Sequence, residues 1–140
     1  MDPRFALVWS FAYLVFIVAA MGAAWLGRVQ LPRYAVLCFE RNARGLKLLK
    51  DWLSPEQLTC YEQHKYFEVI GSDSARVYRI HHGTQTNIEE LDGIGKPVCS
   101  WCFVPEGNLV AGDVMLVQKI ALETNERGAL AVANRSWGAL

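Results

Sequence analysis

An uncharged apolar stretch near the start of the chain, Phe5–Gly27, constrains the fold more than any other feature of the sequence. Its 23 residues would span roughly 34 Å as an α-helix, which is enough to cross a hydrocarbon core of about 30 Å. Trp9 and Trp25 fall near its two ends, where indole rings favour the membrane interface. The sequence therefore predicts a single transmembrane helix within an anchor over residues 1–30.

The charges beside this stretch predict its orientation. Basic and acidic side chains balance at 14 each, but the basic ones concentrate directly after the stretch, whereas Arg4 on the other side is offset by Asp2. Because basic residues stay on the cytoplasmic side, we expect the N-terminus outside and the folded domain in the cytoplasm. The cysteines would then be reduced thiols without disulfides.

Two other interpretations of the apolar stretch stay open. Small residues over 19–24 suit a signal peptidase, so the stretch could be a cleaved signal peptide. Against this, it is longer than a usual signal core, and the basic cluster would oppose translocation. The stretch could also be a helix buried in a protein core, although it contains almost no polar residue.

Small residues recur within the stretch at a spacing that favours helix contacts. Ala19, Ala23 and Gly27 fall at i, i+4 and i+8. Small side chains in this rhythm let helices approach closely in lipid, so we expect other transmembrane helices as partners, in a homo-oligomer or a larger complex. Alanine and glycine are also common in such helices without any partner.

A basic amphipathic helix is predicted over residues 31–53. Apolar residues recur there every three or four positions, while a second face carries Arg41, Arg44, Lys47 and Lys50. Beside a membrane such a face can contact anionic lipid or an acidic partner. An ordinary helix with solvated charges is the simpler alternative, and Gly45 weakens the expectation of one unbroken helix.

Residues 54–140 are expected to form a small α+β domain of four antiparallel strands with flanking helices. Ser54 and Gln57 are spaced as a capping box that starts a helix reaching about Lys65. The apolar period then becomes two, and short turns favour an antiparallel meander. The expected strands are 66–70, 76–81, 86–91 and 98–104, followed by helices over 113–123 and 126–133.

Part of this domain, Phe67–Ala133, resembles a group of uncharacterised bacterial proteins. The resemblance rests on the sequence at 67–72, Tyr78-Arg79-Ile80, Gly83 with Asn87, Cys102 followed by Pro105, and Gly112–Leu116 leading to Gln118-Lys119 and Leu122-Glu123. The group has no assigned activity, so the resemblance implies a domain boundary and no chemistry. A bacterial source would make the predicted location the inner (cytoplasmic) membrane.

One motif, Cys99-Ser100-Trp101-Cys102, invites a chemical interpretation. With Cys60 and His64 it would complete a set of zinc ligands, and alone it resembles a thiol redox pair. However, residues i and i+3 of a strand point to opposite faces, so the two sulfurs should diverge. Cysteine as a small apolar core residue is the simpler interpretation.

The sequence shows no other catalytic pattern. It has no Ser-His-Asp order, no phosphate-binding loop and no metalloprotease helix, and its basic residues outside 31–53 are too scattered for nucleic-acid binding. We therefore expect a membrane-anchored, non-catalytic interaction or accessory subunit of a larger assembly, without a cofactor. Its partners would bind the exposed sheet edge or the loop at Asn108. A zinc-binding or thiol-redox domain using Cys99 and Cys102 is the alternative.

Overall fold

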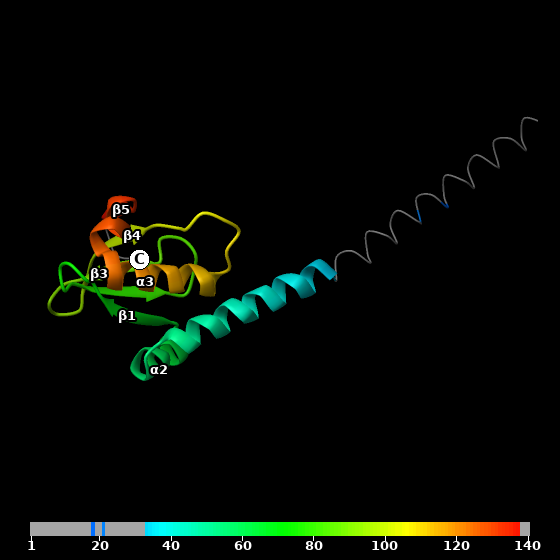
Figure 1. The fold of residues 1–140 in the computed structure, drawn as a ribbon, viewed down its shortest axis with the longest axis horizontal. Coiled ribbons are helices and arrows are strands. Elements are labelled where there is room, and N and C mark those ends of the chain that lie inside the picture. The colour runs from blue at the N-terminus through cyan, green and yellow to red at the C-terminus, as the bar shows by residue number, and fades with distance from the viewer. Residues whose placement is uncertain (1–17, 19–20, 22–32, 138–140) are drawn as a thin grey trace, which may run out of the picture. The chain divides into compact units, whose positions relative to one another are not determined.

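The computed structural model describes Val18, Met21 and residues 33–137 of the chain (Figure 1). The chain divides into two compact units, Met1–Glu40 and Arg41–Leu140. Residues 33–52 are helical. The elements that follow are α2 (Pro55–His64), β1 (Tyr66–Ile70), β2 (Val77–His81), β3 (Ile88–Leu91), β4 (Pro97–Cys102), α3 (Ala111–Ala131) and β5 (Asn134–Trp137).

The structure corrects the predicted membrane anchor. Among the described residues, no helix is both long enough and apolar enough to cross a membrane. The predicted span, Phe5–Gly27, lies outside the described residues except for Val18 and Met21. The predictions of a single-pass membrane protein and of an inner-membrane location are therefore corrected, and nothing below depends on them.

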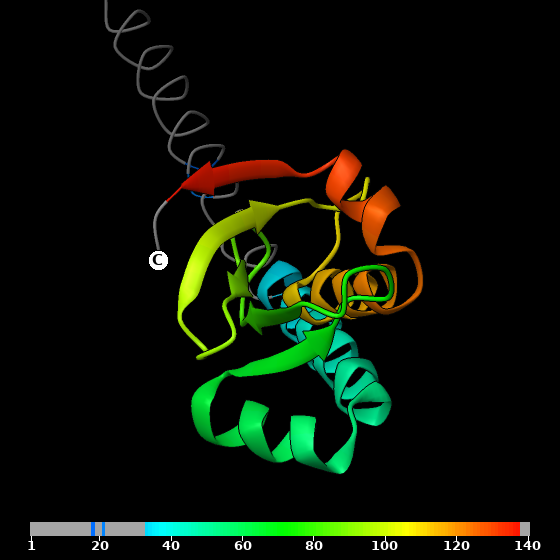
Figure 2. The same ribbon diagram turned by 90° about the vertical axis from the view of Figure 1, so that its left-hand side faces the viewer.

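The predicted four-stranded sheet is also wrong, because the sheet has five strands in the order β1-β2-β3-β4-β5, all antiparallel. The residues of β5 follow the predicted helix over 126–133 and were not expected to form a strand. Asn134, Arg135 and Ser136 carry no apolar alternation, so sequence periodicity gives no signal for this strand. Figure 2 shows the curved sheet, with β5 in red at one edge.

The hydrophobic core lies between one face of the sheet and the helices. Phe67 and Val69 of β1, and Tyr78 and Ile80 of β2, are buried at alternate positions, as a strand with one covered face requires. They belong to one cluster with helix residues that include Leu49, Leu53, Met115 and Leu122. Each such side chain contributes about 1.5–3 kcal/mol when fully buried.

The helix over residues 33–52 is not interrupted at Gly45. A Cβ at Gly112 in α3 would lie 2.3 Å from the carbonyl carbon and oxygen of Gly45. Two glycines therefore allow the backbones of residues 41–52 and α3 to cross in direct contact. Gly45 serves close packing between helices, which is why its low helix propensity is tolerated.

The start of α2 agrees with the sequence prediction. The Ser54 side chain accepts a hydrogen bond from the Gln57 N–H at 3.2 Å, and the Gln57 side chain accepts one from the Ser54 N–H at 3.1 Å. These two bonds satisfy amide groups that the first turn of a helix leaves without partners. They determine where α2 begins.

Candidate functional site

The structure places few of the residues predicted to contact partners on a free surface. Ala19, Ala23 and Gly27 lie outside the described residues. In the predicted basic face, Arg41 donates to the carbonyl of Asn108, and Lys50 pairs with Glu62 at 2.9 Å. Arg44 lines a shallow depression beside Gly45 and Asp113, and Lys47 is exposed. Arg41 and Lys50 therefore bind groups within the domain.

The four predicted zinc or redox residues do not form a site. Among the described residues, no group of three or more His, Cys, Asp or Glu side chains is placed to hold a metal ion. Cys99 is fully buried, and its Sγ lies 3.3 Å from a carboxylate oxygen of Glu90. Burial raises the pKa of the Cys99 thiol, which disfavours the reactive thiolate. Cys102 is only partly buried, at the end of β4.

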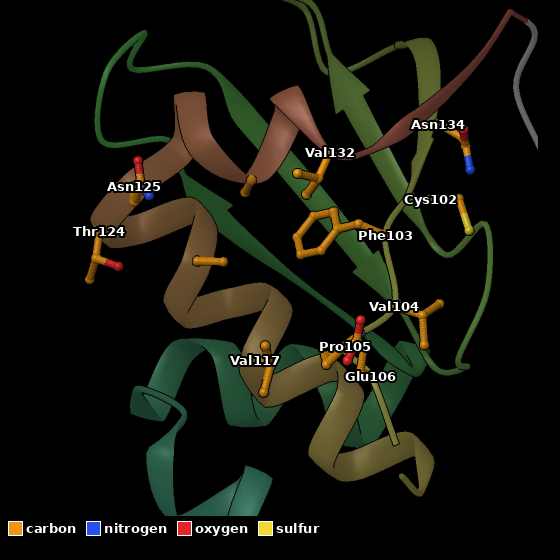
Figure 3. A pocket seen from close by; sticks show the side chains of 12 residues that line it. Cys102, Phe103, Val104, Pro105, Glu106, Val117, Thr124, Asn125, Val132 and Asn134 are labelled. Atoms are coloured by element: carbon orange, nitrogen blue, oxygen red, sulfur yellow. The ribbon is translucent and has the colours of Figure 1, made fainter. Parts of the chain in front are cut away.

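A groove of about 810 Å³ lies between α3 and the chain that leaves β4. Figure 3 shows the Phe103 ring pointing from this segment toward the helix. Most of the lining side chains are apolar, and they include Phe103, Val104, Val117, Ala121, Ala129 and Val132. Polar groups at its border come from Cys102, Glu106, Thr124, Asn125 and Asn134. We call this cavity the α3 groove.

A kink in α3 gives the α3 groove its shape. Asn125 has a non-helical backbone, with φ −154° and ψ 60°, so the helix changes direction there. Val117 and Ala121 line the groove before the kink, whereas Ala129 and Val132 line it after the kink. The predicted break between helices over 113–123 and 126–133 agrees with this non-helical residue, which separates two helical segments within α3.

The turn between β1 and β2 holds both sides of this kink. The Ser72 N–H donates to the carbonyl of Leu122, and the Ser72 hydroxyl accepts from the Glu126 N–H at 3.1 Å. An Asp73 carboxylate oxygen accepts from the Arg127 N–H at 2.9 Å. The turn therefore satisfies the Leu122 carbonyl near the end of the first helical segment. It also satisfies the Glu126 and Arg127 amides at the start of the second.

The buried carboxylate of Glu126 completes this connection. It accepts hydrogen bonds from the Asp73 N–H at 2.8 Å, from the Ser74 N–H at 2.7 Å and from the Tyr78 hydroxyl at 2.6 Å, and it also binds the Ser74 hydroxyl. A Cβ at Gly71 would lie 2.4 Å from the Glu126 carboxyl carbon, so a larger residue there would have to displace this carboxylate.

The ionisation of Glu126 follows from these donors. Burial alone raises the pKa of Glu126, but the hydrogen bonds from Ser74 and Tyr78 and from the two amides outweigh it and lower that pKa to about 2. Burial, together with the bond to Glu126, raises the pKa of Tyr78. At neutral pH the ionised Glu126 carboxylate therefore accepts hydrogen bonds from the turn and from the neutral Tyr78 phenol.

A second buried carboxylate lies on the opposite face of the sheet. A carboxylate oxygen of Glu89 is hydrogen-bonded to His81 Nε2 at 2.9 Å. The same oxygen lies 3.8 Å from a guanidinium nitrogen of Arg79. Arg79 also pairs with Glu68 at 2.8 Å. His82 instead contacts the Tyr61 hydroxyl, so the two histidines have different partners, as strand alternation predicts. We interpret Glu89, Arg79 and His81 as a structural ion cluster.

No protein-family model matches the chain, and no curated protein or solved structure is significantly similar to it. The resemblance over Phe67–Ala133 therefore stays a prediction. Function has to be argued from the geometry of the described residues.

Sequence analysis did not identify the α3 groove. Val117 and Val132 were expected only as residues of the helices over 113–123 and 126–133, and Phe103 as a residue of the strand 98–104. An isolated valine carries no signal that distinguishes a core position from a groove position. Only the kink at Asn125 and the path of the chain after β4 bring these residues together.

Proposed function

We propose that the chain is a non-catalytic interaction subunit that binds an apolar segment of a partner protein in the α3 groove. The observation that carries this proposal is the apolar lining of an open cavity of about 810 Å³. Concave, mostly apolar cavities of about 300–1,000 Å³ with a few polar groups are the usual form of a binding site.

The exposure of the lining side chains supports a site that is accessible from solvent. Val132 is 77% exposed, Val104 44% and Val117 40%. These side chains belong to three separate segments, and a ligand that contacts all three would remove them from water together. Burying apolar surface contributes roughly 25 cal/mol per Å² before the cost of ordering the ligand.

The chemistry of the groove favours binding over catalysis. Histidine does not appear among its lining residues, and its carboxylate, on Glu106, belongs to an exposed residue. A general acid or base usually has its pKa adjusted by burial or by a charged neighbour. The buried carboxylates with such neighbours, on Glu89 and Glu90, are bound to groups of the sheet.

Selection of peptides on the full chain tests the proposal. A library of random 12-residue peptides is panned against the protein, and the affinity of an enriched peptide is measured by fluorescence anisotropy. We expect enriched sequences with bulky apolar residues. Val132→Asp and Val117→Asp should each weaken binding at least about tenfold, because they place a charge in the apolar contact.

A matched control uses an exposed apolar residue outside the groove. Ile94, in the turn between β3 and β4, is 77% exposed, as Val132 is. Ile94→Asp should change peptide affinity by less than about twofold. The proposal fails if panning enriches no common sequence, or if the Ile94 variant loses as much affinity as the groove variants.

A further inference from the structure

We infer that Ser74, in the turn between β1 and β2, is a phosphorylation site whose modification weakens binding in the α3 groove. This inference rests on the proposed function, and it names how that function is regulated. A protein kinase would transfer the γ-phosphoryl group of a nucleoside triphosphate to the Ser74 Oγ. The bond from this phosphorus to the nucleoside diphosphate breaks as the new P–O bond forms, and a base of the kinase takes the hydroxyl proton.

The turn presents Ser74 at the surface, and bonds to Glu126 hold the turn in shape. Residues 72–76 are all exposed. Ala75 has φ +57°, a left-handed conformation that alanine seldom adopts. Such a conformation persists where surrounding contacts impose it, and here the Asp73 and Ser74 amides both donate to Glu126. Losing the contact with Glu126 would therefore let the turn relax.

The Ser74 hydroxyl donates to the carboxylate that positions the second segment of α3. Glu126 directly follows the kink at Asn125, and Ala129 and Val132 of the same segment line the α3 groove. A phosphoryl group on Ser74 would remove the hydroxyl donor and add about 1.5 to 2 negative charges at pH 7. Glu126 is buried and ionised, so salt screens this repulsion only weakly. Phosphorylation should therefore displace Glu126 and, with it, one wall of the groove.

A cavity of about 280 Å³ beside Ser74 offers the phosphoryl group a second position. Its lining includes Ser74, Arg76 and Arg127, and both arginines are exposed. Guanidinium groups bind phosphate oxygens strongly and can donate two hydrogen bonds at once. The phosphoryl group would compete with Glu90 for Arg76. Because the arginines are exposed whereas Glu126 is buried, they should draw the modified side chain outward and away from Glu126.

Full-length protein with phosphoserine incorporated at position 74 tests the inference. Its affinity for a peptide selected on the unmodified chain is measured by fluorescence anisotropy. We expect binding to be weaker by at least about tenfold. Hydrogen exchange over residues 126–131 should become faster, because the segment loses its attachment to the turn. Ser74→Ala loses the hydroxyl without gaining charge, and it should weaken binding by less than about threefold.

Phosphoserine incorporated at position 54 is the matched control. Ser54 is also exposed, and its hydroxyl also donates to a carboxylate, that of Glu56 at 2.9 Å. Glu56 is itself exposed, and neither residue lines the α3 groove. The same added charge at position 54 should therefore change peptide affinity by less than about twofold. Equal losses from the two modified positions would attribute the effect to net charge and would overturn the inference.

Failure of the inference can be distinguished from failure of the proposed function. If phosphoserine at position 74 leaves the affinity unchanged while the unmodified chain binds the peptide, the inference fails and the proposed function stands. If the unmodified chain binds no selected peptide, the proposed function fails, and the inference fails with it.

Mass spectrometry of the protein isolated from the cells that produce it tests whether the modification occurs. Fragment ions of the peptide that contains the turn distinguish a phosphate on Ser74 from one on Ser72. We expect a phosphate on Ser74. Its absence there, or a phosphate on Ser72 alone, would overturn the inference.

Discussion

At the scale of single residues, Glu126 makes the most specific contribution to this fold. Its side chain is almost fully buried, with 3% exposure, and it joins α3 to a turn more than 50 residues earlier in the chain. Each donor that faces it would be left unsatisfied if the carboxylate were lost, and an unsatisfied buried donor costs about 1–3 kcal/mol.

Glu126→Gln should therefore lower the free energy of unfolding by about 2–4 kcal/mol, since the amide can accept from only part of this donor set. Urea denaturation followed by circular dichroism measures the change. Glu62→Gln is the control, because Glu62 is exposed and pairs with Lys50 at the surface, and its loss should stay within about 0.5 kcal/mol. Equal losses in the two variants would contradict the role given to Glu126.

The Glu126 carboxylate should also make the free energy of unfolding depend on pH. The pKa of Glu126 falls from an ordinary value of 4.5 to about 2 on folding, so its contribution is complete above pH 4.5 and is lost as the pH falls toward 2. A difference of this size corresponds to about 3 kcal/mol. Over this pH range the stability of the native protein should fall more steeply than that of Glu126→Gln. Parallel pH profiles would refute this assignment.

At the scale of elements, the crossing at Gly45 and Gly112 determines how closely the helix over residues 41–52 approaches α3. We expect Gly112→Ala to lower the free energy of unfolding by about 1–3 kcal/mol, because the new methyl group would meet backbone atoms that cannot rotate away. Gly93→Ala is the matched control, since a Cβ there meets nothing within 4 Å. Differential scanning calorimetry of both variants decides the matter, and unchanged melting in Gly112→Ala would argue against a close crossing.

The elements also show which features the sequence could predict. The capping box at Ser54 and the alternation in β1 and β2 are local patterns, and the structure agrees with both. In contrast, β5 is polar and short, and it exists because β4 offers it a partner. The break in α3 near Asn125 was predicted, but its hydrogen bonds to the turn at Ser72 lie outside any window of sequence around residue 125.

In the candidate site, too, local sequence patterns were predictive, whereas contacts between distant segments were not. Strand alternation predicted that Cys99 and Cys102 would diverge, and the structure buries Cys99 against Glu90. The α3 groove needs three segments and a helix kink to come together, so no spacing rule could identify it. The predicted contacts of Ala19, Ala23 and Gly27 fall outside the described residues.

At the scale of the whole molecule, the second compact unit, Arg41–Leu140, contains the complete described core and the α3 groove. A chain that begins at Arg41 should therefore unfold in one cooperative step, with a free energy within about 1 kcal/mol of that of the full chain, because no core side chain is removed. It should also bind a selected peptide within about twofold of the full-length affinity. Urea denaturation and fluorescence anisotropy measure the two quantities. A shortened chain that stays folded but no longer binds would show that residues 1–40 contribute to the site, whereas one that does not fold would show that the core extends beyond the described cluster.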